Sequence, residues 1–262
     1  MKKGNYFTMA KLDGQKAKID IYGEIVSENY RWSDVDTSAV SFRDALAALG
    51  DVEELDIHIN SPGGDVFEGA AIANMIKRHP ATTNSYVDGL SASIASTIAV
   101  SADNVYMPEN AMLMIHNAWS VFMGNHNELR EYADALEKIN NSTVKQSYID
   151  KNPDIDVEVL SAMMDKETWL SASEAKELGL IDEVIGAVQV AASITKEQKE
   201  RFTNIPAALA AEVEPVIETP SSIDKEYLDK AIQQLKDEIA DLKKPVEPVK
   251  DSSLSAFFLN IN

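Results

Sequence analysis

The sequence predicts an α/β fold built from repeated strand–loop–helix units. Short apolar runs of strand length alternate with longer stretches that carry apolar residues at helical spacing. The unit occurs twice in succession, at residues 55–80 and 84–102, and each copy has a glycine-containing loop between strand and helix. Because crossover helices bring the carboxyl ends of parallel strands to one edge of a sheet, both loops are expected at the same edge.

The other elements follow the same alternation. Residues 19–25 alternate like a half-buried strand, and residues 41–50 have the capping serine, apolar spacing and closing glycine of a short helix. A later helix opens at Ser171 with a capping box and closes at Gly179. The remaining expected elements are strands at 55–60, 84–88, 104–108 and 111–119, helices at 65–80, about 94–102, about 126–150 and 156–164, and a last short strand.

The longest expected helix, about residues 126–150, is polar over most of its surface. Its apolar stripe is narrow and consists of Leu129, Ala133, Leu136, Ile139 and Thr143. Such a helix either lies on its own domain or protrudes and pairs with a neighbouring subunit.

Composition excludes several classes of protein. The 262 residues are 45% hydrophobic, and 24 Lys and Arg against 43 Asp and Glu give a net charge of −19. Such a charge repels a phosphate backbone, so nucleic acid is not an expected partner. The absence of cysteine excludes disulfides, thiolate catalysis and Cys-ligated zinc, which suits the cytoplasm. We find no signal peptide or membrane span, and expect no cofactor, metal or membrane partner.

The composition changes beyond about residue 190. Residues 207–222 are rich in Ala, Glu and Pro and read as a linker, residues 223–242 read as a charged amphipathic helix, and an apolar peptide closes the chain. We therefore expect a catalytic domain over 1–190 and an acidic tail over 191–262.

Ser93 is the candidate nucleophile. It ends the stretch GLSAS (89–93), where a strand-to-helix turn would aim its hydroxyl out of the sheet and toward the positive end of a helix. A serine nucleophile needs a base within hydrogen-bond reach, a group that orients the base, and donors for the oxyanion. Taken alone, the stretch is also consistent with serines that are present only because they are small. The residues expected to accompany a catalytic serine therefore decide between the two interpretations.

Two companions favour catalysis. The stretch Asn60-Ser61-Pro62-Gly63-Gly64 lies at the other loop, where two glycines allow backbone N–H groups to turn outward; with the Ile94 N–H they could form an oxyanion hole. His116 ends the apolar run 111–115, and the intervening chain has room for a helix and a strand to bring it back to Ser93. The other histidines, His58, His79 and His126, are expected to be structural or solvated.

These motifs resemble the proteolytic subunit of the Clp protease, ClpP, and more closely the ClpP-like proteases encoded beside phage capsid genes. The matching pieces, over about residues 15–190, are INSPGG (59–64), GLSAS (89–93), MLMIH (112–116) and ETWLSASEAKELGLIDEV (167–184). The resemblance implies a ClpP/crotonase-like spiral of strand–strand–helix units. It also implies that residues 126–150 form a protruding handle helix that interlocks two rings into a closed chamber, followed here by a C-terminal helical tail.

The resemblance also implies roles for single residues. It makes Ser93 the nucleophile, His116 the general base, and the N–H groups of Gly64 and Ile94 the oxyanion hole. The family's orienting aspartate corresponds to Glu167, with Asp165 as the rival. A glutamate can hold the second imidazole nitrogen if its backbone lies one methylene further back.

Three classes of function remain open. The first is a serine endopeptidase that cuts unfolded or flexible chains inside a ring-type homo-oligomer. The second is a crotonase-like enzyme that polarises an acyl-CoA thioester, although it would not need Ser93 paired with His116. The third is a ClpP-like assembly platform without catalysis.

Within the peptidase class, the extension of about seventy residues favours a phage head maturation protease that processes capsid or scaffold protein in the host cytoplasm or prohead. The alternative is a subunit that degrades unfolded proteins delivered by an AAA+ unfoldase. No catalytic motif lies beyond Val184, so the tail is expected to deliver the enzyme and to be dispensable for peptide hydrolysis.

Overall fold

The computed structural model describes residues 9–11, 15–33, 35–187 and 201–206. The chain divides into two compact units, residues 1–212 and 213–262, and the second lies wholly outside the described residues. The linker and amphipathic helix predicted over 207–242 therefore also lie outside them, and the domain boundary at residue 190 stays a prediction.

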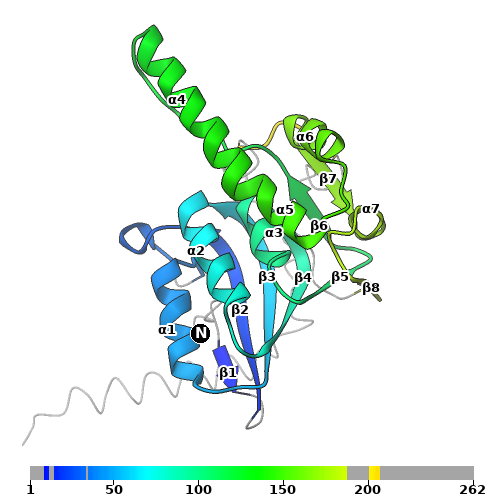
Figure 1. The fold of residues 1–262 in the computed structure, drawn as a ribbon. Coiled ribbons are helices and arrows are strands. Elements are labelled where there is room, and N and C mark those ends of the chain that lie inside the picture. The colour runs from blue at the N-terminus through cyan, green and yellow to red at the C-terminus, as the bar shows by residue number, and fades with distance from the viewer. Residues whose placement is uncertain (1–8, 12–14, 34, 188–200, 207–262) are drawn as a thin grey trace, which may run out of the picture. The chain divides into compact units, whose positions relative to one another are not determined.

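The described residues form a mixed α/β fold, as predicted, and its sheet has eight strands (Figure 1). The strands are β1 (Met9–Lys11), β2 (Lys16–Ile25), β3 (Glu54–Gly64), β4 (Thr82–Ala92), β5 (Asn104–Pro108), β6 (Met112–Ile115), β7 (Thr168–Ser171) and β8 (Glu183–Ile185). The helices are η1 (Glu28–Tyr30), α1 (Ala39–Leu49), α2 (Val66–Lys77), α3 (Ile94–Ala99), α4 (His126–Ile139), η2 (Asn140–Val144), α5 (Lys145–Lys151), α6 (Val157–Asp165) and α7 (Ala172–Glu177). No helix in these ranges is long and apolar enough to span a membrane.

Strand β4 pairs with two different neighbours along its length. The main path is β1-β2-β3-β4-β5-β8, in which all pairs except β1–β2 are parallel. The first half of β4, at residues 84–86, pairs with β5, whereas residues 90–92 pair with β6. Strand β6 pairs in turn with β7 in the antiparallel sense. This change of neighbour brings the end of β6 beside the end of β4, where the two principal site candidates lie.

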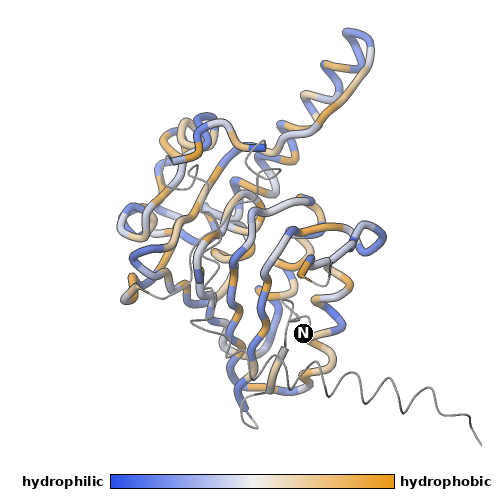
Figure 2. The backbone as a smooth tube through the Cα atoms, turned by 180° about the vertical axis from the view of Figure 1, so that it is seen from behind, coloured by the Kyte–Doolittle hydropathy of each residue, from blue (hydrophilic) through white to orange (hydrophobic). Residues whose placement is uncertain are grey.

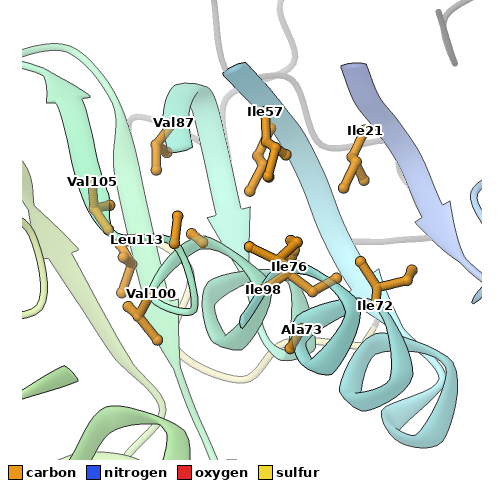
Figure 3. Packing of buried hydrophobic residues seen from close by; sticks show 14 of the residues in the cluster. Ile21, Ile57, Ile72, Ala73, Ile76, Val87, Ile98, Val100, Val105 and Leu113 are labelled. Atoms are coloured by element: carbon orange, nitrogen blue, oxygen red, sulfur yellow. The ribbon is translucent and has the colours of Figure 1, made fainter. Parts of the chain in front are cut away.

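The core lies between the sheet and the helices on one of its faces. Helices α2, α3 and α5 cross that face in Figure 1. Side chains from adjacent strands meet those of the helices, and the tube alternates between hydrophobic and hydrophilic residues along the strands (Figures 2 and 3). Each fully buried aliphatic side chain contributes roughly 1.5–3 kcal/mol. The buried residues drawn in Figure 3 include Ile21, Ile57 and Val87 from strands and Ile72, Ile76 and Ile98 from helices.

The predicted long helix is present but interrupted. Helix α4 passes into the π-helical turn η2 and then into α5, so the run covers residues 126–151. Helix α4 protrudes from the body in Figure 1, and no residue of this fully described helix is buried; Leu129 is 46% exposed. Of the two arrangements left open by the sequence, the structure has the protruding one.

Several predicted boundaries were wrong. The SPGG and GLSAS segments, expected as loops, belong largely to β3 and β4, because Gly63 and Gly64 pair with β2 and residues 90–92 pair with β6. Helix α1 begins at Ala39, and Ser38, rather than Ser41, is its N-cap; Ser41 completes the capping box. Strand β7 was not predicted as a strand.

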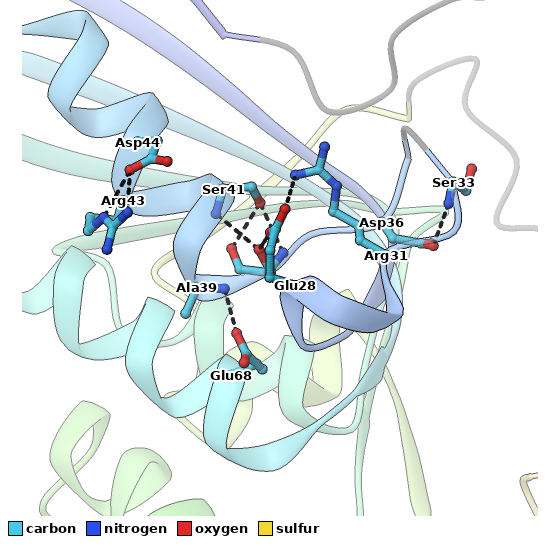
Figure 4. A network of polar contacts seen from close by, with 10 residues as sticks. Glu28, Arg31, Ser33, Asp36, Ala39, Ser41, Arg43, Asp44 and Glu68 are labelled. Atoms are coloured by element: carbon cyan, nitrogen blue, oxygen red, sulfur yellow. Dashed lines mark hydrogen bonds and ion pairs between the residues drawn. The ribbon is translucent and has the colours of Figure 1, made fainter.

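The loop between β2 and α1 is held by polar contacts (Figure 4). Glu28 accepts a hydrogen bond from the Ser38 hydroxyl and lies 3.6 Å from Arg31 in an ion pair. The Ala39 N–H donates to Glu68 of α2 at 2.7 Å. These contacts fix the loop against two helices, and the loop forms one side of the pocket described below.

Candidate active site

Ser93 lies at a sharp turn between β4 and α3. It is the N-cap of α3, with φ 57° and ψ −131°, and its N–H donates to the Met114 carbonyl at 3.0 Å. A positive φ at a residue other than glycine costs about 1–3 kcal/mol and persists only where the surroundings enforce it. A strained strand-to-helix turn of this kind exposes a nucleophilic hydroxyl at the edge of a sheet.

A buried pair behind Ser93 holds its backbone. The Ser96 hydroxyl donates to the Ser93 carbonyl at 2.6 Å and lies 2.7 Å from the Tyr148 hydroxyl. Ser96 and Tyr148 are fully buried, and burial raises the pKa of Tyr148. Sequence reasoning missed both residues; the available signal was a third serine one helical turn beyond Ser93.

His116 follows directly after β6 and contacts the candidate nucleophile. Its Nε2 lies 2.7 Å from the Ser93 Oγ, as predicted for a general base. The side chain is 8% exposed, and burial lowers its pKa, while the charge of Glu167 acts in the opposite direction. A lowered pKa keeps the imidazole neutral near pH 7, the form that can accept the serine proton.

The two candidate carboxylates differ in their surroundings. Glu167 is 8% exposed, has φ 50°, and precedes β7, whose partner strand leads to His116. Asp165 ends α6 and accepts a hydrogen bond from the Asn117 side chain at 2.7 Å. Among the described residues, no hydrogen bond joins the His116 Nδ1 to either carboxylate, but Glu167 is the one whose charge acts on His116. Glu167 therefore stays the first candidate and Asp165 the alternative.

The Glu167 carboxylate is bound by a distant segment. It accepts hydrogen bonds from the Thr203 N–H at 2.9 Å and the Asn204 N–H at 2.8 Å, and from the Thr203 hydroxyl at 3.1 Å. The indole N–H of Trp169 lies 3.3 Å from the same carboxylate. These contacts come from residues beyond Val184, where no catalytic motif was predicted, because backbone N–H donors carry no sequence motif. The prediction that residues 191–262 are dispensable for peptide hydrolysis stays a prediction.

The glycine stretch lies against the nucleophile. Gly63 has φ 89°, and a Cβ there would lie 2.7 Å from the Ser93 Cβ and 3.2 Å from the Ile94 nitrogen. Gly64 has φ 149°, and a Cβ there would lie 2.0 Å from the Ile25 carbonyl oxygen. Both positions thus require glycine. The structure brings Gly64 into the same pocket as Ser93, and places Ile94 directly after Ser93 as the first residue of α3.

A pocket of about 390 Å³ opens at the Ser93–His116 pair. Its walls come from the β2–α1 loop, the glycine stretch, the segment after β6, and residues 201–202. The residues that line it include Val26, Tyr30, Pro62, Trp119, Arg201 and Phe202.

The other histidines have separate partners. The His58 Nδ1 lies 2.8 Å from Asp88, and its ring stacks on Tyr86 with centroids 4.8 Å apart. His79 Nδ1 accepts the Ala81 N–H at 3.2 Å, and His126 is exposed at the start of α4. Within the described ranges, no group of three or more His, Asp or Glu side chains could hold a metal ion.

A serine at a strained turn, hydrogen-bonded to a buried histidine and close to a glycine stretch, is an arrangement found in serine hydrolases. The Clp protease family profile matches residues 15–188, so the chain belongs to the Clp protease family, a family of serine peptidases. The resemblance inferred from the four motifs is confirmed at this level.

Two individual proteins show the same relationship. The chain is 30% identical over 136 residues to the ATP-dependent Clp protease proteolytic subunit of Deinococcus radiodurans; the match covers 51% of this chain and 65% of that protein. The fold is similar to that of a ClpP1 point mutant from Listeria monocytogenes, with a TM-score of 0.55 and 27% identity, over 64% of this chain and 91% of the other. The predicted ClpP-like fold is confirmed.

Proposed function

We propose that the chain is a serine endopeptidase of the ClpP type. The observation that carries the proposal is the 2.7 Å contact between the His116 Nε2 and the Ser93 Oγ, both of which line the pocket. A crotonase-like reaction on a thioester would not need this pair. Family membership and the buried, neutral imidazole support the same reading.

The reaction follows from the proton positions. With its own proton on Nδ1, His116 accepts the Ser93 proton at Nε2 as the Oγ attacks the peptide carbonyl. The N–H groups of Gly64 and Ile94 stabilise the oxyanion, and His116 then gives the proton to the leaving amine. Water, deprotonated by the same imidazole, hydrolyses the acyl-enzyme and restores the Ser93 hydroxyl.

Glu167 supplies the third function in this scheme. Its negative charge stabilises the imidazolium that forms when His116 takes the proton, and favours the tautomer with the proton on Nδ1. The charge acts on His116 in the resting structure and opposes the effect of burial. Asp165 is the alternative acid, but its carboxylate is bonded to Asn117.

We expect the enzyme to act as a homo-oligomer. No residue of α4 is buried, and four exposed hydrophobic residues lie in the segment just before the helix or on it. A second copy of the chain would bury them, in the manner of a ring-type chamber. The exposed residues are Val121, Phe122, Met123 and Leu129.

For the biological substrate we propose phage capsid or scaffold protein, cut during head maturation in the host cytoplasm or prohead. This proposal is supported by the residues that follow the family match. The match ends at residue 188, and the residues beyond it could include a delivery segment. A second candidate is degradation of unfolded proteins delivered by an AAA+ unfoldase, supported by the name of the Deinococcus relative.

Hydrolysis of fluorogenic peptides by the full-length chain tests the catalytic proposal. Ser93→Ala should lower kcat by several orders of magnitude, on the scale of about 10⁶ known from a dissected triad, and leave fold and assembly unchanged. Ser91→Ala is the matched control, because the Ser91 hydroxyl is buried without a hydrogen-bond partner in the described structure. Activity of Ser93→Ala equal to wild type would overturn Ser93 as the nucleophile, whereas no activity in either chain would favour a non-catalytic assembly platform.

A further inference from the structure

We propose that residues 201–204, named here the active-site strap, complete the peptidase site: the backbone N–H groups of Thr203 and Asn204 position the Glu167 carboxylate beside His116, and Phe202 forms an apolar wall of the substrate pocket. The inference rests on the proposed function and adds to it a group of positioning and specificity residues. These residues lie beyond the stretch that matches the family, which ends at residue 188.

The strap is anchored at both ends. Arg201 forms an ion pair with Glu24 of β2 at 3.0 Å, on one side of the pocket. The Asn204 side chain donates to the Lys166 carbonyl at 2.6 Å, next to the candidate acid. The strap therefore runs from the β2 side of the pocket to the turn that carries Glu167.

The middle of the strap binds the carboxylate itself. The Thr203 N–H lies 2.9 Å from each Glu167 oxygen, and the Asn204 N–H lies 2.8 Å from one of them. A buried carboxylate is stabilised by such hydrogen bonds, and backbone N–H groups hold it in one orientation. A negative charge held in one orientation stabilises the imidazolium that forms when His116 accepts a proton as general base.

Phe202 covers the base on the pocket side. Its ring centroid lies 6.2 Å from that of His116 and 5.4 Å from that of Trp169, in an edge-on contact. The ring packs on a small cluster formed by Leu90, Ala92 and Met114. Phe202 thus shields His116 from water and contributes to the burial that lowers the pKa of the imidazole.

The same ring sets what the pocket can accept. Phe202 lines the pocket together with Ile25, Val26, Val66 and Trp119, while the positive charge of Arg201 is paired with Glu24. This wall is apolar, so the strap favours substrates with an apolar side chain beside the scissile bond. A substrate side chain of this kind would contact Phe202 directly.

Substitutions in the full-length chain separate the backbone donor from the side chain. Thr203→Pro removes the N–H, whereas Thr203→Val keeps it and removes only the hydroxyl. We expect Thr203→Pro to lower kcat by about 10²-fold, with a smaller loss for Thr203→Val and none for Ile205→Ala. In a Glu167→Gln background, Thr203→Pro should cause little further loss, because the positioned group is already gone.

Phe202 provides a pH readout that a purely structural role would not change. Phe202→Ala exposes His116, so its pKa should rise and the acidic limb of kcat/KM should move to higher pH. KM for peptides with a large apolar residue at the cleavage site should also rise, and Phe202→Leu should restore both properties in part. An acidic limb at the wild-type position in Phe202→Ala contradicts the shielding role.

The outcomes distinguish this inference from the proposed function. An active wild-type chain with unchanged kcat in Thr203→Pro overturns the strap inference alone. Increased kcat in Thr203→Pro also overturns it, because it shows that the strap sequesters Glu167 and inhibits the enzyme. A wild-type chain that neither hydrolyses peptide nor is labelled at Ser93 by a fluorophosphonate overturns the proposed function and this inference together.

Discussion

At the residue scale, the backbone conformation of Ser93 and two contacts fix its position before any substrate binds. Its backbone adopts a strained φ of 57°, its carbonyl accepts the Ser96 hydroxyl, and its own hydroxyl lies 2.7 Å from His116. Fixing the nucleophile and base in this way removes much of the entropy that would otherwise be lost when the reacting atoms meet. Strain at this position is therefore consistent with the proposed reaction.

If Glu167 is the acid that assists His116, two effects are expected: a ranking of kcat between variants of the two candidate acids, and a shift in the pH dependence of kcat/KM. Glu167→Gln should lower kcat far more than Asp165→Asn, by up to about 10⁴-fold, the loss known for the corresponding change in a well-studied triad. Because the charge of Glu167 raises the pKa of His116, its removal should lower that pKa further. The acidic limb of kcat/KM should then move to lower pH.

Steady-state kinetics across pH measure both effects. Asp165→Asn is the control, since Asp165 contacts Asn117 and is not among the groups that shift His116. The opposite ranking of kcat would assign the role to Asp165.

At the element scale, helices α2 and α3 pack closely at Ile94, whose N–H is a proposed oxyanion donor. A Cβ at Gly69 of α2 would lie 2.3 Å from the Ile94 Cγ1. Because Ile94 begins α3 directly after Ser93, any shift of its backbone moves the proposed N–H donor. The spacing of these two helices is thus part of the site.

Gly69→Ala should reduce both stability and turnover. Overpacking at this contact should cost about 1–3 kcal/mol in the free energy of unfolding, and kcat should fall because the Ile94 N–H is displaced. Gly186→Ala is the matched control, since a Cβ there meets no atom within 4 Å. Denaturant unfolding and peptide hydrolysis measure the two quantities; normal kcat in Gly69→Ala would argue against Ile94 as a donor.

An interaction can be predicted from the sequence only where it requires a particular type of amino acid. Ser93, His116 and Gly64 could be proposed from the sequence because a nucleophile, a base and a close backbone approach each restrict the type of residue at one position. The strap was missed because Thr203 and Asn204 bind Glu167 largely through backbone N–H groups, which every residue except proline has. Strand β7 was missed because its four residues are paired by tertiary contact with β6.

At the scale of the whole molecule, α4 is a helix in which no residue is buried. Leu129 lies on the exposed part of the helix, which protrudes from the body (Figure 1). Phe122 and Tyr132 stack at 4.4 Å and tie the preceding segment to the helix. This contact places the exposed residues of the preceding segment next to α4, on the surface proposed to meet a second copy.

Leu129→Glu should dissociate the proposed homo-oligomer. A charge placed on an apolar contact is desolvated without a partner when two copies meet, so association should weaken. Light scattering after size-exclusion chromatography measures the mass, and Asn127→Glu, on the same exposed helix, is the control. An unchanged mass for Leu129→Glu would show that α4 does not form the interface.

Removal of the second unit, residues 213–262, tests whether it delivers the enzyme to its protein substrate, and it leaves the active-site strap in the chain. A chain ending at Glu212 should hydrolyse short peptides like the full-length chain, but should process co-expressed capsid protein poorly and fail to co-purify with proheads. Equal capsid processing by both chains would remove the delivery role from this unit.

The central claim is that Ser93 is a nucleophile activated by His116, and covalent labelling tests it most directly. Full-length protein treated with a fluorophosphonate, followed by digestion and mass spectrometry, should give one adduct on the peptide that contains Ser93. Labelling should be lost in Ser93→Ala, strongly slowed in His116→Ala, and unchanged in Ser91→Ala. An adduct on another residue, or labelling that persists in Ser93→Ala, would contradict the account.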